Sequence, residues 1–352
     1  MDSSQNCKIS MAKNKRIKIG LFFGGTSKER KVSLISGRNI AKYLNTKKYE
    51  IIPVEISEKG KWLVDSKTIR TIRDTANIKK THLAKELIAA EASTTSAIDV
   101  AFLALHGPGG EDGTIQGMLE LLGIPYTCSG VLASALAMDK ARTKKLLSTS
   151  GVDVLPHVII TKEDYKKNSS QILSRIKGKV VIKPNEIGSS IGITIASDKS
   201  DIKKGIQNAF KFDNVLMIEP FLAGREITVP VLGNHKPRVL PCIEIIPLKK
   251  SKFYDYEAKY DQGGSEHIIP ANLTLKQEKE VSRLAYLAHQ VLGCRGVTRS
   301  DFIMDKNGKF YFLEINTIPG MTSTSLVPQS AAHVGISFKK LLEILINLAL
   351  EK

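Results

Sequence analysis

The sequence has little cysteine and no long apolar run. Its 352 residues include four cysteines, whose separations fit neither a CxxC metal or redox pattern nor the disulfide framework of a small secreted protein. The first fifteen residues are polar and lack the apolar core of a signal peptide, and no run of about eighteen apolar residues occurs. We therefore expect reduced thiols in a cytoplasmic protein that does not cross a membrane.

The positive charge of the chain is scattered rather than clustered. The formal net charge is +17, and a basic patch of that size would suit nucleic acid, because clustered Lys and Arg neutralise phosphates. The lysines instead occur in separate pairs, as in TKKYE, NIKKT and FKKLL, and no recognisable nucleic-acid-binding motif accompanies them. We interpret the excess as a solvated surface and expect no nucleic-acid partner.

Strand and helix patterns alternate in the first part of the chain. The stretch RIKIGLFFGG is typical of a buried strand, and the helical stretch LISGRNIAKYL follows a polar turn. A second apolar run, AIDVAFLALHG, ends in HGPGGEDG, and Thr114 then opens a helix. Such alternation predicts a doubly wound parallel sheet, which binds ligands beyond the carboxyl ends of its strands. The GGTS and HGPGG loops should therefore face one site.

Strand-rich segments follow a helical MDKARTKKLLSTSG stretch, and no internal repeat appears. We expect a flexible tail at 1–15 and three domains at 16–139, 140–225 and 226–352. The C-terminal segment has one apolar helical face, which favours a docked terminal helix over one lying on a membrane. That face comprises Phe338, Leu341, Leu342, Leu345 and Leu348.

A hairpin near the C-terminus fixes a register. The pair Asn307-Gly308 favours a two-residue type I′ turn, in which Lys306 faces Lys309. Strand side chains alternate between faces, so four polar side chains should share one face of this hairpin. The predicted pairs are Asp301 with Glu314 and Arg299 with Asn316.

Two carboxylates directly opposite each other repel, so a cation should lie between Asp301 and Glu314. Oxygen ligands suit a hard ion such as Mg²⁺, which binds through few carboxylates plus substrate phosphates. Arg299 could stabilise negative charge that grows during a reaction. The alternative is a solvent-facing acidic hairpin, but Phe310 and Phe312 should share the acidic face, and this favours a cleft.

The stretch VVIKPNEIGSSIGITIA offers a partner for phosphate. Backbone N–H groups of a glycine-rich turn such as Gly188-Ser189-Ser190 can form an anion nest, and Lys183 adds a positive charge. The P-loop pattern GxxxxGK[ST] is absent, and the turn joins two strands rather than opening a helix. By itself the turn favours a plain hairpin connection over a phosphate site.

Six stretches in order carry a resemblance to the D-alanine:D-alanine ligase family of ATP-grasp ligases. They are FFGGTSKERKVS, ALHGPGGEDGTIQGMLELLGIPYTCSGVLASALAMDK, VIKPNEIGSSIGI, IEPFLAGREITV, FYDYEAKY and TRSDFIMDKNGKFYFLEINTIPGMTSTSLVP, and the likeness extends over nearly the whole chain from Arg16. The resemblance implies an α/β ATP-grasp fold: an N-terminal doubly wound parallel-sheet domain followed by central and C-terminal α+β domains.

The resemblance also implies a reaction and its participants. ATP phosphorylates the carboxylate of one D-alanine, the amine of a second attacks the acyl phosphate, and a tetrahedral intermediate expels phosphate. The products are D-alanyl-D-alanine, a peptidoglycan precursor, with ADP and phosphate. Two Mg²⁺ ions, or Mn²⁺ in their place, and a homodimer are implied too.

The family's site residues map onto matching positions here. For the metal these are Asp301, Glu314 and Asn316. For ATP they are Lys140, Lys183, Ser190, Glu219, Phe221, Leu222, Glu226 and Leu313. Catalytic roles fall on Glu29, Ser189, Tyr260, Arg299 and the backbone N–H of Gly320, and substrate contacts on His106, Lys259 and Ser325. Taken singly, His106 could be a packing histidine, Ser325 a turn cap and Glu29 a surface acid.

The tyrosine-rich stretch FYDYEAKYDQGGSEH resembles the mobile loop that closes this family's site. Lys259 would reach the transferred phosphate, and Tyr260 would hydrogen-bond to Ser189 and through it to Glu29; the tyrosine favours the dipeptide over D-alanyl-D-lactate. Many relatives carry glutamate at the position of Lys31, so a second carboxylate role there is in doubt. Another ATP-grasp ligase, joining different amino acids, is the alternative, but it should lack the HGPGGEDG and YEAKY segments.

Overall fold

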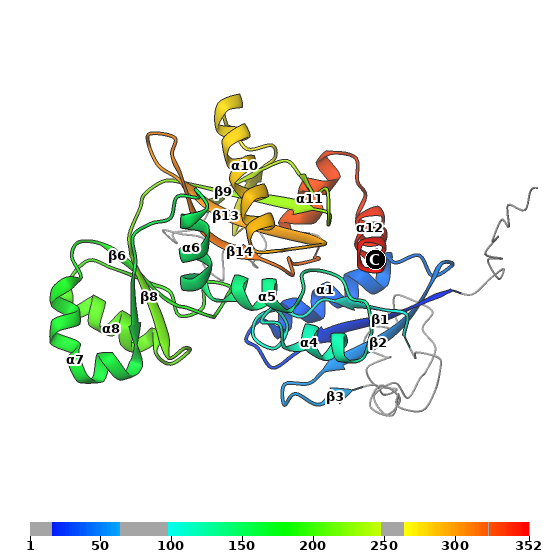
Figure 1. Cartoon of the computed structure of the whole chain (residues 1–352), viewed down its shortest axis with the longest axis horizontal. Coiled ribbons are helices and arrows are strands. Elements are labelled where there is room, and N and C mark those ends of the chain that lie inside the picture. The colour runs from blue at the N-terminus through cyan, green and yellow to red at the C-terminus, as the bar shows by residue number, and fades with distance from the viewer. Residues whose placement is uncertain (1–15, 64–97, 248–263, 323, 352) are drawn as a thin grey trace, which may run out of the picture.

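Three sheets with helices packed against them make up the protein (Figure 1). The structure, a computed structural model, describes residues 16–63, 98–247, 264–322 and 324–351. The N-terminal sheet, the central sheet and the C-terminal sheet follow one another along the chain. This arrangement is the ATP-grasp fold that the resemblance implied.

The N-terminal sheet is parallel except at one edge. Its order is β3-β2-β1-β4, in which β2 and β4 pair in parallel with β1 and the two-residue β3 is antiparallel. The chain leaves β1 toward β2 and returns on the other side for β4, so a topological switch point lies between β1 and β4. The elements are β1 (Ile17–Gly24), α1 (Arg30–Tyr43), β2 (Tyr49–Ile56), β3 (Trp62–Leu63), β4 (Val100–Leu103) and α4 (Thr114–Leu121).

The loops after β1 and β4 meet at this switch point, as the sequence predicted. Ser27 Oγ donates to the His106 carbonyl at 2.6 Å, and Ser33 Oγ donates to the Ala104 carbonyl at 2.6 Å. The helix α1 begins at Arg30, earlier than expected, so Glu29 takes the N-cap position. Glu29 is therefore fixed to the first turn of a helix rather than carried on a free loop.

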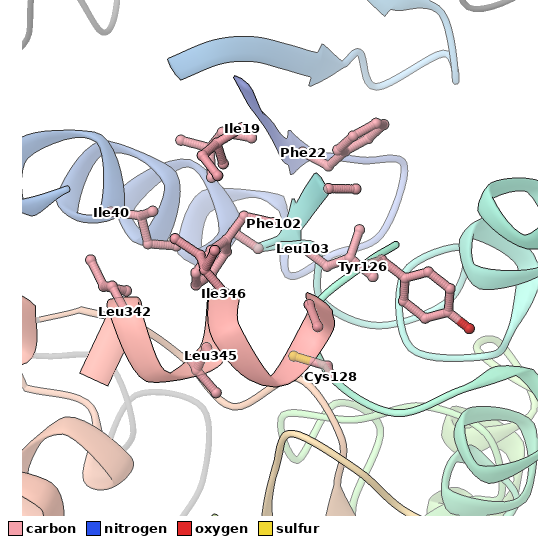
Figure 2. Packing of buried hydrophobic residues seen from close by; sticks show 14 of the residues in the cluster. Ile19, Phe22, Ile40, Phe102, Leu103, Tyr126, Cys128, Leu342, Leu345 and Ile346 are labelled. Atoms are coloured by element: carbon pink, nitrogen blue, oxygen red, sulfur yellow. The ribbon is translucent and has the colours of Figure 1, made fainter. Parts of the chain in front are cut away.

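The terminal helix α12 (Phe338–Leu350) packs on the N-terminal sheet, although it follows the C-terminal one in the chain (Figures 1 and 2). Figure 2 shows Leu342 and Ile346 on the side of this helix that faces the sheet, with Ile346 beside Phe102, and all of them belong to one buried cluster with Ile19. Burial of these side chains ties the C-terminal end of the chain to its beginning. The prediction of a docked helix is confirmed.

The central sheet is antiparallel, with the order β5-β8-β6-β7. Its strands are β5 (Val158–Thr161), β6 (Val180–Pro184), β7 (Thr194–Ala196) and β8 (Val215–Pro220), and α7 (Lys162–Arg175) and α8 (Lys199–Ala209) accompany them. The buried face of α8, including Ile202 and Ile206, packs on Ile182 and Leu216 of the sheet. The loop between β6 and β7 carries the Gly-Ser-Ser turn.

The C-terminal sheet has the order β12-β11-β9-β13-β14, with β10 paired to β9. Helices α5, α6 and α10 pack on it, and their apolar side chains share its core. The remaining bounds are α5 (Val131–Met138), α6 (Lys140–Thr149), β9 (Arg225–Leu232), β10 (Arg238–Val239), β11 (Ile243–Pro247), β12 (Ser265–Ile268), α10 (Leu275–Val291), β13 (Val297–Met304), β14 (Phe310–Asn316) and α11 (Leu326–His333).

The β13–β14 hairpin has the predicted partners but not the predicted turn. Asp305 pairs with Lys309 across a three-residue loop, in which Gly308 has φ +80°. The Asp305 carboxylate accepts the N–H groups of Asn307 and Lys309 at 2.8 and 2.9 Å, and this favours the longer loop. The expected two-residue type I′ turn is therefore wrong, and the loop alone would shift the register by one residue.

A β-bulge in the same hairpin restores the register at the site. The pairing shifts between Asp301 and Phe302, so Leu313 is the extra residue on β14. Asp301 therefore pairs with Glu314, and Arg299 with Asn316, as predicted.

The bulge also overturns the expectation that Phe310 and Phe312 share the acidic face. Both rings lie in the core beneath the sheet, where Phe312 contacts Phe302 edge-on with ring centroids 5.7 Å apart. Leu313 and Glu314 instead both face the cleft described below, because a bulge interrupts the strict alternation of side chains.

No helix of the described residues is long and apolar enough to cross a membrane. Within that part of the chain Cys128, Cys242 and Cys294 are buried free thiols, in agreement with the expected reduced state.

Candidate active site

Two adjoining pockets lie where the three sheets meet. The first is lined by the loops after β1 and β4, the β6–β7 loop, the β13–β14 hairpin and the segment that leads into α11. The second lies between the central and C-terminal sheets. Lys140 and Glu314 line both pockets, and the Lys140 ammonium lies 3.6 Å from the Glu314 carboxylate. A group bound in one pocket can therefore reach a group bound in the other.

The second pocket combines apolar walls with a charged end. Val181 and Ile195 of the central sheet face Ile303 and Leu313 of the C-terminal sheet across it. Every residue predicted to bind ATP lines this pocket: Lys140, Lys183, Ser190, Glu219, Phe221, Leu222, Glu226 and Leu313. An apolar slot with a few convergent polar groups suits a flat heteroaromatic base with a polar tail.

Two lysines hold the buried Glu219 carboxylate in the wall of this pocket. The Lys183 ammonium lies 2.6 Å from Oε2, and the Lys144 ammonium hydrogen-bonds to Oε1. Burial alone would raise the pKa of Glu219, but the two ammonium groups lower it to about 2. Burial, and then the neighbouring Lys183 charge, lower the pKa of Lys144 to about 8. Lys183, which was expected to bind phosphate, therefore also forms an ion pair with Glu219.

The β6–β7 turn has an uncommon backbone conformation. Ser189 and Ser190 adopt left-handed conformations with φ of 52° and 57°. Such backbone strain costs on the order of 1–2 kcal/mol per residue and persists where other contacts fix it. One such contact is the hydrogen bond from Ser189 Oγ to the Glu29 carboxylate, which links the turn to the first pocket.

Two glycines make room for the Glu29 carboxylate, which is buried. A Cβ added at Gly107 would lie 2.6 Å from Glu29 Oε2, and one added at Gly188 would lie 3.3 Å from it. Gly107 also has φ +72°, a conformation that side chains rarely adopt. The glycines of the HGPGG and GSS loops therefore allow both loops to approach one carboxylate.

A second buried carboxylate, Glu111, faces the same pocket and was not singled out from the sequence. Its Oε2 accepts the Gly107 N–H at 2.7 Å. Burial first, and then the charge of Glu29, raise the pKa of Glu111 to about 8, which keeps it protonated near neutral pH. The only pointer in the sequence was its place in HGPGGEDG.

His106 is a buried, neutral ring in this pocket. Burial, with the positive charge of Arg299, lowers its pKa to about 4, despite a backbone hydrogen bond that acts in the other direction. Its Nε2 lies 3.4 Å from Ser36 Oγ, and Ser36 in turn accepts the N–H of Met321. His106 is thus held between the N-terminal helix and the segment before α11.

The paired hairpin carboxylates are partly compensated by protein cations. Arg299 donates two hydrogen bonds to Asp301, at 2.9 and 2.8 Å, and Thr228 donates another. Glu314 forms an ion pair with Lys140, whose ammonium lies 3.6 Å from the Glu314 carboxylate. Among the described residues no group of three His, Cys, Asp or Glu side chains gathers as a metal site.

The other predicted residues of the first pocket lie where amino acids could bind. Arg299, Asn316, Gly320 and Ser325 all line it. Ser325 Oγ accepts the Thr322 N–H at 2.9 Å, so it also holds a turn. Lys259 and Tyr260, with the loop predicted at 253–263, lie outside the described residues. Lys31 is exposed and does not line either pocket.

Lys144 is the second residue that the sequence analysis missed. It is completely buried on α6, one turn after Lys140, and lines neither pocket. Asp139 caps this helix through its hydrogen bond to the Arg142 N–H at 2.8 Å, which fixes where Lys140 begins it. The spacing of the two lysines in MDKARTKK was visible, but the burial of the second was not.

A nucleotide-type slot between two α+β sheets, joined to a pocket of buried acids, defines an ATP-grasp ligase. The family models described as "D-ala D-ala ligase N-terminus" and "D-ala D-ala ligase C-terminus" match residues 18–129 and 146–347. The chain belongs to the D-alanine–D-alanine ligase family.

Relatives of known name cover the full length. The D-alanine–D-alanine ligase of Carboxydothermus hydrogenoformans is 43% identical over 95% of this chain and 99% of that protein. That of Pelotomaculum thermopropionicum is 41% identical over 95% and 97%. Among solved structures, VanG D-Ala:D-Ser ligase from Enterococcus faecalis has a TM-score of 0.80 at 33% identity, covering 95% of this chain and all of that one. The D-alanine–D-alanine ligase of Bacillus anthracis has a TM-score of 0.74, also at 33% identity, covering 95% and 97%.

We predict that Glu111→Gln changes how stability depends on pH. The raised pKa favours the folded protein fully below the ordinary glutamate pKa of 4.5, and this contribution is lost as pH rises through about 8. Glutamine cannot lose a proton, so the variant should gain melting temperature relative to wild type at about pH 9 but not at about pH 5. Thermal unfolding at both pH values measures this. The exposed Glu163→Gln is the control, and equal shifts at both pH values in Glu111→Gln would contradict the prediction.

Proposed function

We propose that this protein joins two D-alanine molecules to D-alanyl-D-alanine with conversion of ATP to ADP and phosphate. The observation that carries the proposal is the junction of the two pockets at Lys140 and Glu314. Phosphoryl transfer needs a nucleotide and a carboxylate to meet in line, and catalysis of it is mostly positioning and charge stabilisation. The junction is the place where the terminal phosphate of ATP would meet the carboxylate of the first D-alanine.

ATP would occupy the second pocket, with its base between the apolar walls. Lys140, Lys183 and the Ser189-Ser190 turn would hold the phosphates, and Glu226 the ribose hydroxyls. Lys140 supports this assignment, because its ammonium already lies at the pocket junction and donates to the Ile187 carbonyl of the same turn at 2.9 Å. Phosphate oxygens can replace that carbonyl without a large movement of the side chain.

The first D-alanine would lie among the buried acids. Its ammonium suits the Glu29 carboxylate, which Ser189 orients. His106 is neutral, so it would contact the amino acid without competing with Glu29 for the charged groups of the amino acid. The substrate carboxylate oxygen then attacks the γ-phosphorus, ADP leaves, and the product is D-alanyl phosphate.

The second D-alanine would place its carboxylate near Ser325 and its amine near the acyl carbon. Attack by that amine forms the new C–N bond and a tetrahedral oxyanion. Arg299 and the Gly320 backbone N–H would stabilise the oxyanion, because fixed donors aimed at developing charge lower the barrier. Collapse expels phosphate with the oxygen that bridged carbon and phosphorus. Exclusion of water by Lys259 and Tyr260 remains an expectation from the resemblance.

The hairpin residues fit the expected Mg²⁺ ions. Asp301 and Glu314 face each other, Asn316 adds an amide oxygen, and few carboxylates plus phosphate oxygens and water make a typical magnesium set. The same oxygen donors accept Mn²⁺. Bound there, divalent ions would neutralise charge on the nucleotide phosphates. Glu314 and Asp301 would release part of their contact with Lys140 and Arg299 to accept them.

Phosphate release with Mg-ATP tests the proposal. The purified protein is assayed with D-alanine, L-alanine, D-serine plus D-alanine, and D-lactate plus D-alanine, and products are identified by mass. We expect release that requires D-alanine, forms the dipeptide and stops when a chelator removes the divalent ion. Release that needs D-serine would instead favour an amino-acid ligase of different specificity, as the name of the Enterococcus faecalis relative suggests. Folded protein that binds ATP and yields no D-alanine-dependent phosphate would refute the proposal.

Gly107→Ala should impair use of the first D-alanine far more than Gly109→Ala. Both glycines have left-handed backbones, with φ of 72° and 84°, but only a Cβ at Gly107 would meet the Glu29 carboxylate. A displacement of about 1 Å at a reacting group can cost on the order of 10²-fold in rate. We expect a loss of that order in kcat/KM for D-alanine with Gly107→Ala, and near wild-type kinetics with Gly109→Ala. Equal losses in both variants would show that backbone strain, not Glu29, is responsible.

We also propose a cytoplasmic homodimer. Exposed apolar side chains gather where α4 packs against α5, and they support an interface there: Leu121, Leu122, Val131 and Leu132. Leu121 and Leu132 are 91% and 71% exposed, so their burial would be favourable. Sedimentation of wild type and Leu132→Glu at micromolar concentration tests this, and a wild-type monomer would refute it.

A further inference from the structure

Lys144 is a charged group buried where a hydrophobic residue would be less costly. Its side chain is completely buried, and its ammonium reaches only the Glu219 carboxylate among the hydrogen bonds and ion pairs described. Burying an ion pair costs several kcal/mol in desolvation, and replacement by apolar residues is often neutral or stabilising. A role in folding alone therefore explains this lysine poorly.

The position of Lys144 places it behind the nucleotide pocket. Glu219 and Lys183 line the pocket, whereas Lys144 approaches the Glu219 carboxylate from α6 without lining it. Lys140, one turn earlier on the same helix, does line the pocket. The helix thus supplies one lysine to the site and a second that contacts only the site's carboxylate.

The two lysines that contact Glu219 differ in their access to the pocket. Lys183 lies on Oε2 and Lys144 on Oε1. A phosphate or base atom that binds the Lys183 ammonium would weaken the contact between Lys183 and Glu219. Lys144 has no access to the pocket, so its contact persists when nucleotide binds. Each carboxylate oxygen has a further lone pair, and Glu219 can still accept a hydrogen bond from a ligand in the pocket.

We propose that Lys144 is a positioning residue for nucleotide recognition, which holds the Glu219 carboxylate in place as an acceptor for the 6-amino group of adenine. A purine with a 6-oxo group presents an acceptor at that position and would face a fixed negative charge. Lys144 would in this way determine selection of adenine over hypoxanthine, and the inference rests on the proposed use of ATP.

Binding of ADP and IDP by calorimetry tests this role without any amino-acid substrate. The two nucleotides differ at position 6, which is amino in ADP and oxo in IDP, and at N1, which carries a proton only in IDP. We expect wild type to prefer ADP by about tenfold or more, which corresponds to about 1.4 kcal/mol, because a hydrogen bond to a buried charged group is stronger than one between neutral groups. Lys144→Met should reduce the preference to about threefold or less, mainly by weaker ADP binding.

Two variants separate positioning from general damage. Lys145→Met makes the same change at the exposed neighbouring lysine and should keep the wild-type preference. Glu219→Gln alone should abolish the preference for ADP over IDP. The double variant Glu219→Gln/Lys144→Met should have the same ratio of ADP to IDP affinity as Glu219→Gln. An additional loss in the double variant would overturn the inference, because Lys144 would then act independently of Glu219.

Kinetics give a second readout. If D-alanine supports turnover, Lys144→Met should raise KM for ATP and leave KM for D-alanine unchanged. An unchanged ADP to IDP preference in folded Lys144→Met overturns the inference, whereas failure of the wild type to use D-alanine would refute the proposed function and leave the calorimetric result intact. If Lys144→Met does not fold, Lys144→Leu also removes both the donor and the charge; a reduced preference supports the inference, and an unchanged one overturns it.

Discussion

Compensation of buried charge is the constraint on which this site depends. Around the two pockets, acidic and basic side chains are almost completely removed from water, among them Glu29, Glu111, Lys140, Lys144, Lys183, Glu219 and Asp301. Each would be costly alone, and each has a partner from another part of the chain or a shifted pKa. Glu219 lies between two lysines, Asp301 accepts from Arg299, and Glu111 retains its proton. The same groups that would bind nucleotide and amino acid therefore also contact one another across the junction of the three sheets.

This constraint also explains the glycines and the strained serines. Glu29 can be buried between the HGPGG and GSS loops only because Gly107 and Gly188 lack side chains beside it. Ser189 keeps its left-handed backbone while it donates to that carboxylate. The link runs from the N-terminal helix, through Glu29, to the turn expected on the phosphates. An amino acid bound at Glu29 would thus affect the turn that is expected to cover the nucleotide.

From the sequence, the residues that gather at the candidate site could be predicted better than the loops and bulges that bring them together. Local patterns identified the strands, the loops at the switch point and the pairing of Asp301 with Glu314. That pairing was derived from a two-residue turn, whereas the structure has a three-residue loop and a bulge at Leu313 whose effects on register cancel. Neither feature has a strong signal in the sequence, because Asp305 and Leu313 act through hydrogen bonds and packing set by the rest of the sheet. The same limit hid Lys144 and Glu111, since burial depends on which distant elements cover a residue. The roles of Lys259 and Tyr260 stay predictions.

On the proposed mechanism, the carboxylate of D-alanine takes the terminal phosphoryl group of ATP at the junction of the two pockets. Transfer of label from D-alanine with ¹⁸O in its carboxylate tests it directly. The oxygen that attacks phosphorus stays with phosphate when the amine of the second D-alanine displaces it. We therefore expect inorganic phosphate that carries one labelled oxygen for each dipeptide formed, measured by mass spectrometry. Dipeptide formed with unlabelled phosphate would contradict the proposed mechanism, because the carboxylate would then have been activated in some other way.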